Sequence, residues 1–120
     1  MSPKPRRGEV RVARLGDAPK RHWVVVSLDS RTLSDRASSI LAVPFGSYGA
    51  EGPTAMELPP GETGLSGPSF LKAHFVNVLE KRALIERVPG VLSSARMKQV
   101  VDMIRRAVDP DAPWPGKTAR

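Results

Sequence analysis

The spacing of apolar residues along the chain predicts several short strands followed by one helix. Residues 9–15 alternate, with Val10 and Val12 on one face and Glu9 and Arg11 on the other, which is the period of a β-strand. A phase shift at the end of this segment indicates a bulge or the end of the strand. Further strands are predicted over residues 23–28, 40–45, 55–58, 69–79 and 84–88, separated by loops over 16–19, 31–39, 46–53 and 59–68. The uninterrupted apolar run at the start of the 23–28 strand places it in the middle of the sheet.

The segment 69–79 is predicted to be the third long strand. Period two directs four of its residues into the core, namely Leu71, Ala73, Phe75 and Leu79. The opposite face then carries Lys72 and His74 side by side, two residues apart.

The last regular segment is predicted to be an amphipathic helix of roughly 15 residues. Ser93 is its expected N-cap, and Asp109-Pro110 ends it. Its apolar stripe falls at helical spacing and comprises Met97, Val100, Val101, Ile104 and Val108. Met103 lies off this stripe and is expected to be a surplus apolar residue on the surface.

Together these elements predict a mainly β (α+β) fold, a small β-barrel capped by a C-terminal amphipathic helix. A parallel βαβ fold is excluded, because no helix separates the strands. We expect three parts: a flexible arm over residues 1–5, one barrel domain over 6–108, and a proline-rich tail over 109–120. The tail should be disordered unless Trp114 docks on the domain.

Composition narrows the classes of partner. The chain has a formal net charge of +7 and no cysteine. The positive charge favours a polyanion, nucleic acid first, and an acidic protein fits the same surface. The absence of cysteine excludes disulfides and thiolate metal sites. No apolar run approaches the roughly 20 residues of a membrane span, so we expect a soluble, cytoplasmic protein without membrane contact.

Motifs for metal, phosphate or nucleophilic chemistry are absent from the sequence. His22 and His74 have no carboxylate near them in the chain, which makes them a weak ligand set. The glycines of residues 61–67 (GETGLSG) lead into a strand and not into a helix, so this segment is read as a turn. No Ser-His-Asp arrangement follows from the spacing. The sequence therefore predicts neither a metal nor a cofactor.

Six short motifs in order give the chain a resemblance to a known family. They are PRRGEV (5–10), RHWVVVSLD (21–29), ILAVPFGS (40–47), MELPPGETG (56–64), LSGPSF (65–70) and the helical segment 92–108. The first is similar to the family's (P/K)RGEV strand and the second to its RPVVVVSND strand. Over residues 5–108 the chain resembles the MazF/PemK (Kid) toxins, sequence-specific and metal-independent endoribonucleases of type II toxin–antitoxin systems.

The resemblance implies an SH3-like, CcdB/MazF-like barrel that forms a homodimer. It implies neutralisation by a co-encoded antitoxin with an acidic, disordered segment, and indirect binding to operator DNA through that antitoxin. It also implies cleavage of single-stranded RNA by attack of a ribose 2′-hydroxyl on phosphate, which leaves a cyclic phosphate. The loop between the first two strands is short here, so the groove should be more open than is usual in the family.

The resemblance also selects three candidate catalytic residues. Arg21 matches the family's arginine, whose guanidinium would stabilise the charge that develops on phosphate. The family's threonine is replaced by Gly46, and the neighbouring Ser47 is the residue that could supply a hydroxyl. His74 replaces the family's carboxylate, and an imidazole suits proton transfer near neutral pH.

Further residues are candidates for contact with RNA. Lys72 keeps the family's positive charge, Asn77 stands where the family has an arginine, and His22 replaces the usual proline beside Arg21. The two remaining candidates are the cations Arg7 and Lys20.

Two other classes of function stay open on the sequence. The family's threonine is missing, and so are the aspartate and terminal arginine of its DQxR motif, where His74 and Asn77 stand. These losses favour a barrel without catalysis that binds RNA, antitoxin or an operator complex. The fold also suits a CcdB-like toxin that binds gyrase, although the basic surface argues against this. Both alternatives predict no RNA cleavage, and only the second predicts inhibition of DNA supercoiling.

Overall fold

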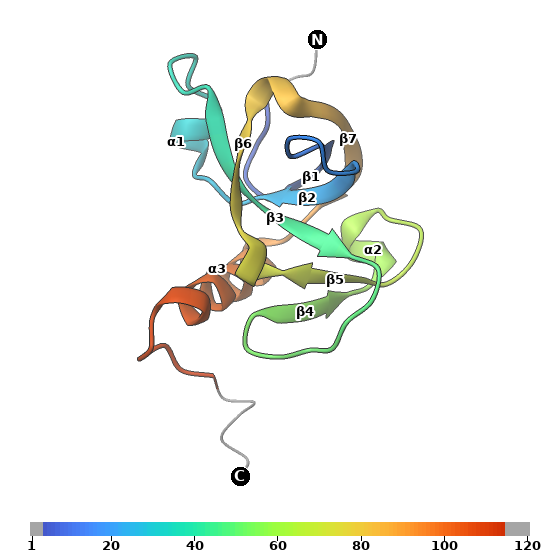
Figure 1. The fold of residues 1–120 in the computed structure, drawn as a ribbon, viewed down its shortest axis with the longest axis vertical. Coiled ribbons are helices and arrows are strands. Elements are labelled where there is room, and N and C mark those ends of the chain that lie inside the picture. The colour runs from blue at the N-terminus through green and yellow to red at the C-terminus, as the bar shows by residue number, and fades with distance from the viewer. Residues whose placement is uncertain (1–3, 115–120) are drawn as a thin grey trace.

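The computed structural model describes residues 4–114 and shows a seven-stranded antiparallel sheet with one long helix (Figure 1). The elements follow in the order β1 (Glu9–Ala13), β2 (Arg21–Val25), α1 (Asp29–Thr32), β3 (Ser39–Gly46), β4 (Ala55–Leu58), α2 (Pro60–Thr63), β5 (Ser69–Lys72), η1 (Ala73–Phe75), β6 (Asn77–Glu80), η2 (Lys81–Ala83), β7 (Leu84–Val91) and α3 (Ser94–Val108). This confirms the predicted mainly β fold with a C-terminal helix. No helix within residues 4–114 has both the length and the apolar character to span a bilayer.

The strand β3 organises the sheet, because it pairs with three neighbours. Residues 42–44 of β3 pair with β2 on one edge. On the other edge, residues 39–42 pair with β6 and residues 45–46 pair with β5. The sheet continues through β1 to β7 at one end and through β5 to β4 at the other, and β1, β2 and β7 curl over as in a barrel (Figure 1).

Both faces of this sheet are buried, and each covers its own core. The larger core lies between the sheet and α3, and its buried residues include Val10, Val24, Val43, Phe45, Leu71, Met97 and Val100. The second core comprises Ala13, Trp23, Val25, Ile40, Ala42, Leu79 and Leu84. Successive residues of β2 therefore pack on opposite sides, which explains the continuous apolar run in its sequence.

The helix α3 begins and ends as predicted. The side chain of Ser93 accepts a hydrogen bond from the Arg96 backbone N–H, and the helix ends at Val108. The predicted stripe is wrong at two positions. Met103 is buried, with 2% of its surface exposed, whereas Val108 is 78% exposed. The helix turns Met103 toward the core because it continues the line of Met97 and Val100 at three-residue spacing.

The prediction of one long strand over 69–79 is wrong. A 3₁₀ turn, η1, divides it into β5 and β6, which pair with opposite ends of β3. Phe75 is therefore 59% exposed and does not enter the core, although Leu71, Ala73 and Leu79 do. The turn also separates Lys72, the last residue of β5, from His74, so the two do not share one face of a strand.

Several other boundaries differ from the predictions. The strand β1 ends at Ala13, and the register shift between Val12 and Ala13 in the β1–β7 pair confirms the expected irregularity. The strand β2 ends at Val25 because the chain turns into α1 soon afterwards, and both α1 and α2 lie partly or wholly in segments expected to be loops. The strand β7 passes through Pro89-Gly90 and continues to Val91.

The two ends of the chain were predicted to be flexible, and residues 1–3 and 115–120 of these segments lie outside the described residues. Lys4 pairs with Asp35 at 2.7 Å between Nζ and Oδ1. At the other end, Arg106 donates to the Pro113 carbonyl, and the half-buried Trp114 lines a hollow beside α3.

Candidate active site

The start of β2 directs two candidate residues to opposite sides of the sheet. Arg21 lies on the same face as Trp23, whose indole N–H donates to the Ala13 carbonyl at 3.3 Å and fixes the orientation of the strand. His22 lies on the other face. Arg21 is exposed and His22 is half-buried.

Arg21 lines a hollow of about 350 Å³, which we call the Arg21 hollow. The wall comes from the β1–β2 loop on one side and from η1 and the start of β6 on the other. Trp23 and Pro44 contribute apolar lining. The hollow brings Arg21 together with two other predicted residues, His74 and Asn77, from the distant end of the sequence.

Two of the polar side chains of the Arg21 hollow, Arg21 and His74, are free to meet a ligand. Within residues 4–114, Arg21 makes no ion pair or side-chain hydrogen bond. His74 is exposed, and its ring stands edge-on to Phe75 with centroids 5.5 Å apart. The side-chain oxygen of Asn77 accepts from the Val78 backbone N–H at 2.8 Å. A guanidinium without a carboxylate partner suits bidentate binding of a phosphate, and a nearby imidazole can carry a proton.

Ser47 lies in a different hollow, of about 520 Å³. This Ser47 hollow contains His22 and is bounded by the loop between α2 and β5 and by Val88 of β7. Ser47 and His22 therefore form one group and Arg21 and His74 another, on the two sides of the β2–β3 pair.

Lys72 occupies the space over Gly46. A Cβ atom at position 46 would lie 2.8 Å from both Cε and Nζ of Lys72. The same ammonium lies 5.5 Å from the centre of the Tyr48 ring. Gly46, which the sequence presents as a lost hydroxyl, thus makes room for a cation on the face of β3 that also carries Pro44.

The two remaining candidates lie apart from these groups. Arg7 is at the opposite end of the β1–β2 hairpin, where its side chain donates to the Val26 carbonyl and its backbone N–H donates to Asp29. Lys20 is exposed and immediately precedes β2.

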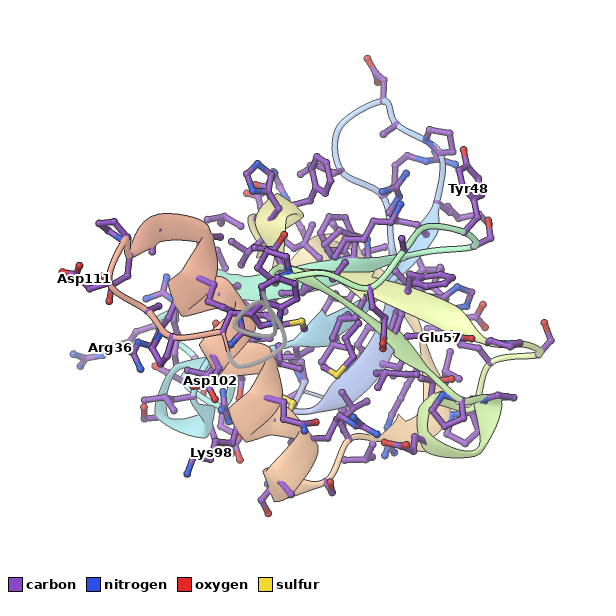
Figure 2. All side chains as sticks on the ribbon, turned by 90° about the horizontal axis from the view of Figure 1, so that it is seen from below. Arg36, Tyr48, Glu57, Lys98, Asp102 and Asp111 are labelled. Carbon is purple, nitrogen blue, oxygen red and sulfur yellow. The ribbon has the colours of Figure 1, made fainter. Side chains whose placement is uncertain are left out.

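No pattern in the sequence was strong enough to select Tyr48 or Phe75 as functional residues. Tyr48 is 79% exposed. Figure 2 shows it at the upper right edge of the molecule, whereas α3 lies at the left. Its position as the single tyrosine of the chain, between Gly46 and Gly49 in a loop, was the available clue. No group of three or more metal-binding side chains occurs among residues 4–114.

Comparison with known proteins decides the family. A family model described as PemK-like, MazF-like toxin of type II toxin–antitoxin system matches residues 6–108. The chain belongs to this family. A search of curated proteins found no significant match to the sequence.

Several solved structures are similar to this chain in fold. An endoribonuclease in complex with its cognate antitoxin, from a mycobacterial species, is 25% identical with a TM-score of 0.74 and covers 92% of this chain and 99% of its own. A second mycobacterial endoribonuclease is 23% identical with a TM-score of 0.73, covering 96% and 99%. A MazE–MazF complex from Deinococcus radiodurans is 17% identical with a TM-score of 0.71, covering 90% and 98%. The predicted MazF-like barrel fold is thus confirmed.

Proposed function

We propose that this MazF-like toxin is an endoribonuclease that cleaves single-stranded RNA without a metal ion, in the Arg21 hollow. One observation carries the proposal. In a chain of this family, a single hollow contains both Arg21, which is exposed and has no ion-pair partner within residues 4–114, and the exposed His74. The 25% identical mycobacterial relative is an endoribonuclease, and this likeness supports the proposal.

The reaction is an intramolecular transfer on phosphate. The ribose 2′-oxygen forms a bond to phosphorus, and the bond from phosphorus to the 5′-oxygen breaks, which yields a 2′,3′-cyclic phosphate and a 5′-hydroxyl. One proton leaves the 2′-hydroxyl and one must reach the departing 5′-oxygen. Arg21 stabilises the charge on the equatorial phosphate oxygens, and His74 transfers a proton in the same hollow.

The other candidates hold the RNA. Lys20 and Asn77 lie next to the Arg21 hollow or in its wall, so they contact the phosphate backbone near the cut. His22 and Ser47 contact the RNA on the other side of the β2–β3 pair. Ser47 acts in the transfer step only if its hydroxyl reaches around the end of β3, and its substitution is therefore part of the test. Arg7 is held by its hydrogen bonds to Asp29 and to the Val26 carbonyl, so it contributes least to RNA binding.

The partners we propose follow from the family and the surface. A cognate antitoxin with an acidic segment suits the net charge of +7, and operator DNA is bound through that antitoxin. A homodimer is favoured by two apolar side chains that lie opposite each other in the β3–β6 pair. Leu41 is 44% exposed and Val78 is 52% exposed. This set of partners is consistent with the cytoplasm.

One alternative retains a specific observation in its favour. Gly46 carries no hydroxyl, and Ser47 lies outside the Arg21 hollow, so a barrel that binds RNA or antitoxin without cleaving remains the second candidate.

The deciding experiment incubates purified protein and a long single-stranded RNA in EDTA, then analyses the product ends. We expect cuts at defined sites with cyclic-phosphate ends. His74→Ala should reduce the rate at least tenfold, because general acid–base catalysis contributes about 10²–10⁴-fold. Ser47→Ala should change the rate less than fivefold. RNA binding without any cleavage would establish the binding module instead, and inhibition of DNA supercoiling would indicate a gyrase-binding toxin.

A further inference from the structure

The structure contains an exposed aromatic ring held against a cation, outside both hollows. Tyr48 is 79% exposed in the loop that follows β3. The Lys72 ammonium lies over this ring, 5.5 Å from its centre, and most of the side chain remains open to solvent. Within residues 4–114, Lys72 has no carboxylate partner.

The backbone is shaped to hold this pair. The Lys72 side chain occupies the place where a Cβ at residue 46 would stand, only 2.8 Å from its Cε and Nζ. Gly49 closes the loop from the other side, since a Cβ there would be 3.6 Å from both Lys72 Cε and Phe70 Cγ. Gly49 has a φ of +152°, a conformation that other residues rarely adopt. Two glycines thus let the loop cover Lys72 and present Tyr48 outward.

This pair is next to the Arg21 hollow along two strands. Pro44 lines the hollow, and Gly46 lies two residues further on the same face of β3. Lys72 ends β5 immediately before η1, which carries His74 into the hollow. A single strand of RNA that leaves the hollow along this face meets Lys72 and Tyr48 next.

We propose that Tyr48 and Lys72 form a nucleotide subsite, in which a base adjoining the cleaved bond stacks on the Tyr48 ring and its phosphate pairs with the Lys72 ammonium. Base stacking on an exposed aromatic ring is tolerant of base identity, and a lysine beside it supplies the charge for the backbone. Gly46 is needed because any side chain there displaces the ammonium. The inference rests on the proposed function for the position of the cleaved bond.

The test measures binding of a short single-stranded 2′-O-methyl RNA, which has no free 2′-hydroxyl and cannot be cut by the proposed reaction. Each position in turn carries the fluorescent base 2-aminopurine. Tyr48→Ala should weaken binding about tenfold, and it should abolish the fluorescence quenching seen at one position in wild type. Tyr48→Phe keeps the ring and should retain both, whereas Tyr48→Leu keeps only apolar area and should behave as Tyr48→Ala.

Two further variants test the cation. Lys72→Met and Gly46→Ala should each lower the slope of log affinity against log salt by about 0.7, the value for one phosphate contact on a single strand. Thermal unfolding checks that each variant is folded. Wild-type affinity and quenching in Tyr48→Ala, or quenching retained in Tyr48→Leu, would overturn the subsite.

Cleavage of unmodified RNA by the wild type is measured in parallel, so that the two proposals fail separately. Quenching that depends on the ring, in a protein that never cuts RNA, would support the subsite and refute the ribonuclease. Cleavage with binding that is indifferent to Tyr48 would refute the subsite and leave the ribonuclease in place.

Discussion

Glu9 is a buried acid that neutralises the buried Arg11 of the same strand. Its carboxylate, 8% exposed, lies 3.1 Å from Nη1 of the fully buried Arg11 and 3.3 Å from Nε of Arg87. It also accepts from the Arg6 backbone N–H. Nε and Nη2 of Arg11 have no hydrogen-bond partner within the described residues, so Glu9 carries the compensation for this buried charge.

Glu9→Ala should therefore lower the free energy of unfolding by about 3–5 kcal/mol, because it leaves Arg11 buried without its counter-ion. Denaturation by urea, followed by circular dichroism, measures this. Glu80→Ala is the matched control, since Glu80 pairs with Arg82 in an exposed ion pair that contributes at most about 1 kcal/mol. Equal losses in the two variants would show that Arg11 does not need Glu9.

For single residues, the sequence predicted the environment where it depends on one strand and missed it where it depends on contacts between strands. The motif at Arg21 and the buried run after it were readable because they lie on one strand. The roles of Gly46 and Arg11 were not readable. Gly46 meets Lys72 only through the pairing of β3 with β5, and Arg11 is buried because the sheet covers a second core on that face.

The elements α2 and β7 approach each other closely through their backbones. A Cβ on Gly90 of β7 would be 2.0 Å from the carbonyl oxygen of Thr63 in α2, a distance that no side chain can adopt. Gly90→Ala should thus force the two elements apart and destabilise the fold by about 1–3 kcal/mol or more. Gly67→Ala is the control, because nothing lies within 4 Å of its added Cβ. Equal melting temperatures for the two variants would contradict this packing.

An ion pair joins α2 to α3 and makes stability depend on pH. Arg96 donates to both carboxylate oxygens of Glu62, at 2.9 and 2.8 Å. These hydrogen bonds hold the pKa of Glu62 below its ordinary value of 4.5. A depressed pKa means that the stabilisation is present above pH 4.5 and is lost as the pH falls through the folded-state pKa.

Glu62→Gln should therefore reduce the free energy of unfolding at pH 7 by up to about 1 kcal/mol, a value suited to a partly exposed pair. The difference from wild type should shrink as the pH is lowered below 4.5. Urea denaturation at a series of pH values measures it, with the exposed Glu57→Gln (Figure 2) as the control. If the difference in unfolding free energy between wild type and Glu62→Gln grew as the pH fell, the ion pair would not stabilise the fold in this way.

The segment 69–79, which forms two strands and not one, shows what local sequence patterns do not predict. The sequence from Leu71 to Leu79 alternates well enough to read as one strand, and three of the four expected inward residues are buried. What decides the break is that β3 pairs with β5 and β6 at its two ends and leaves η1 between them. Such long-range pairing is invisible to local periodicity, yet it is the break that brings His74 into the Arg21 hollow.

For the whole molecule, the exposed apolar pair on β3 and β6 predicts the assembly. Leu41→Glu should convert a dimer to a monomer, because it places a charge within the apolar contact we propose. Sedimentation velocity measures the change. Val91→Glu is the control, since Val91 is 50% exposed at the end of β7, which β3, β2 and β1 separate from β6 in the sheet. A dimer that persists in Leu41→Glu but dissociates in Val91→Glu would place the interface on β7.

If RNA is cut in the Arg21 hollow, as we propose, then Arg21→Ala must lower the single-turnover cleavage rate. Removing one group that stabilises charge in a transition state costs about 10²–10³-fold in rate. We expect a loss of that size, with affinity for 2′-O-methyl RNA changed only a few-fold. Arg36→Ala, an exposed arginine far from Tyr48 in Figure 2, should cleave as wild type does. A cleavage rate in Arg21→Ala equal to that of wild type would show that RNA is not cut in the Arg21 hollow.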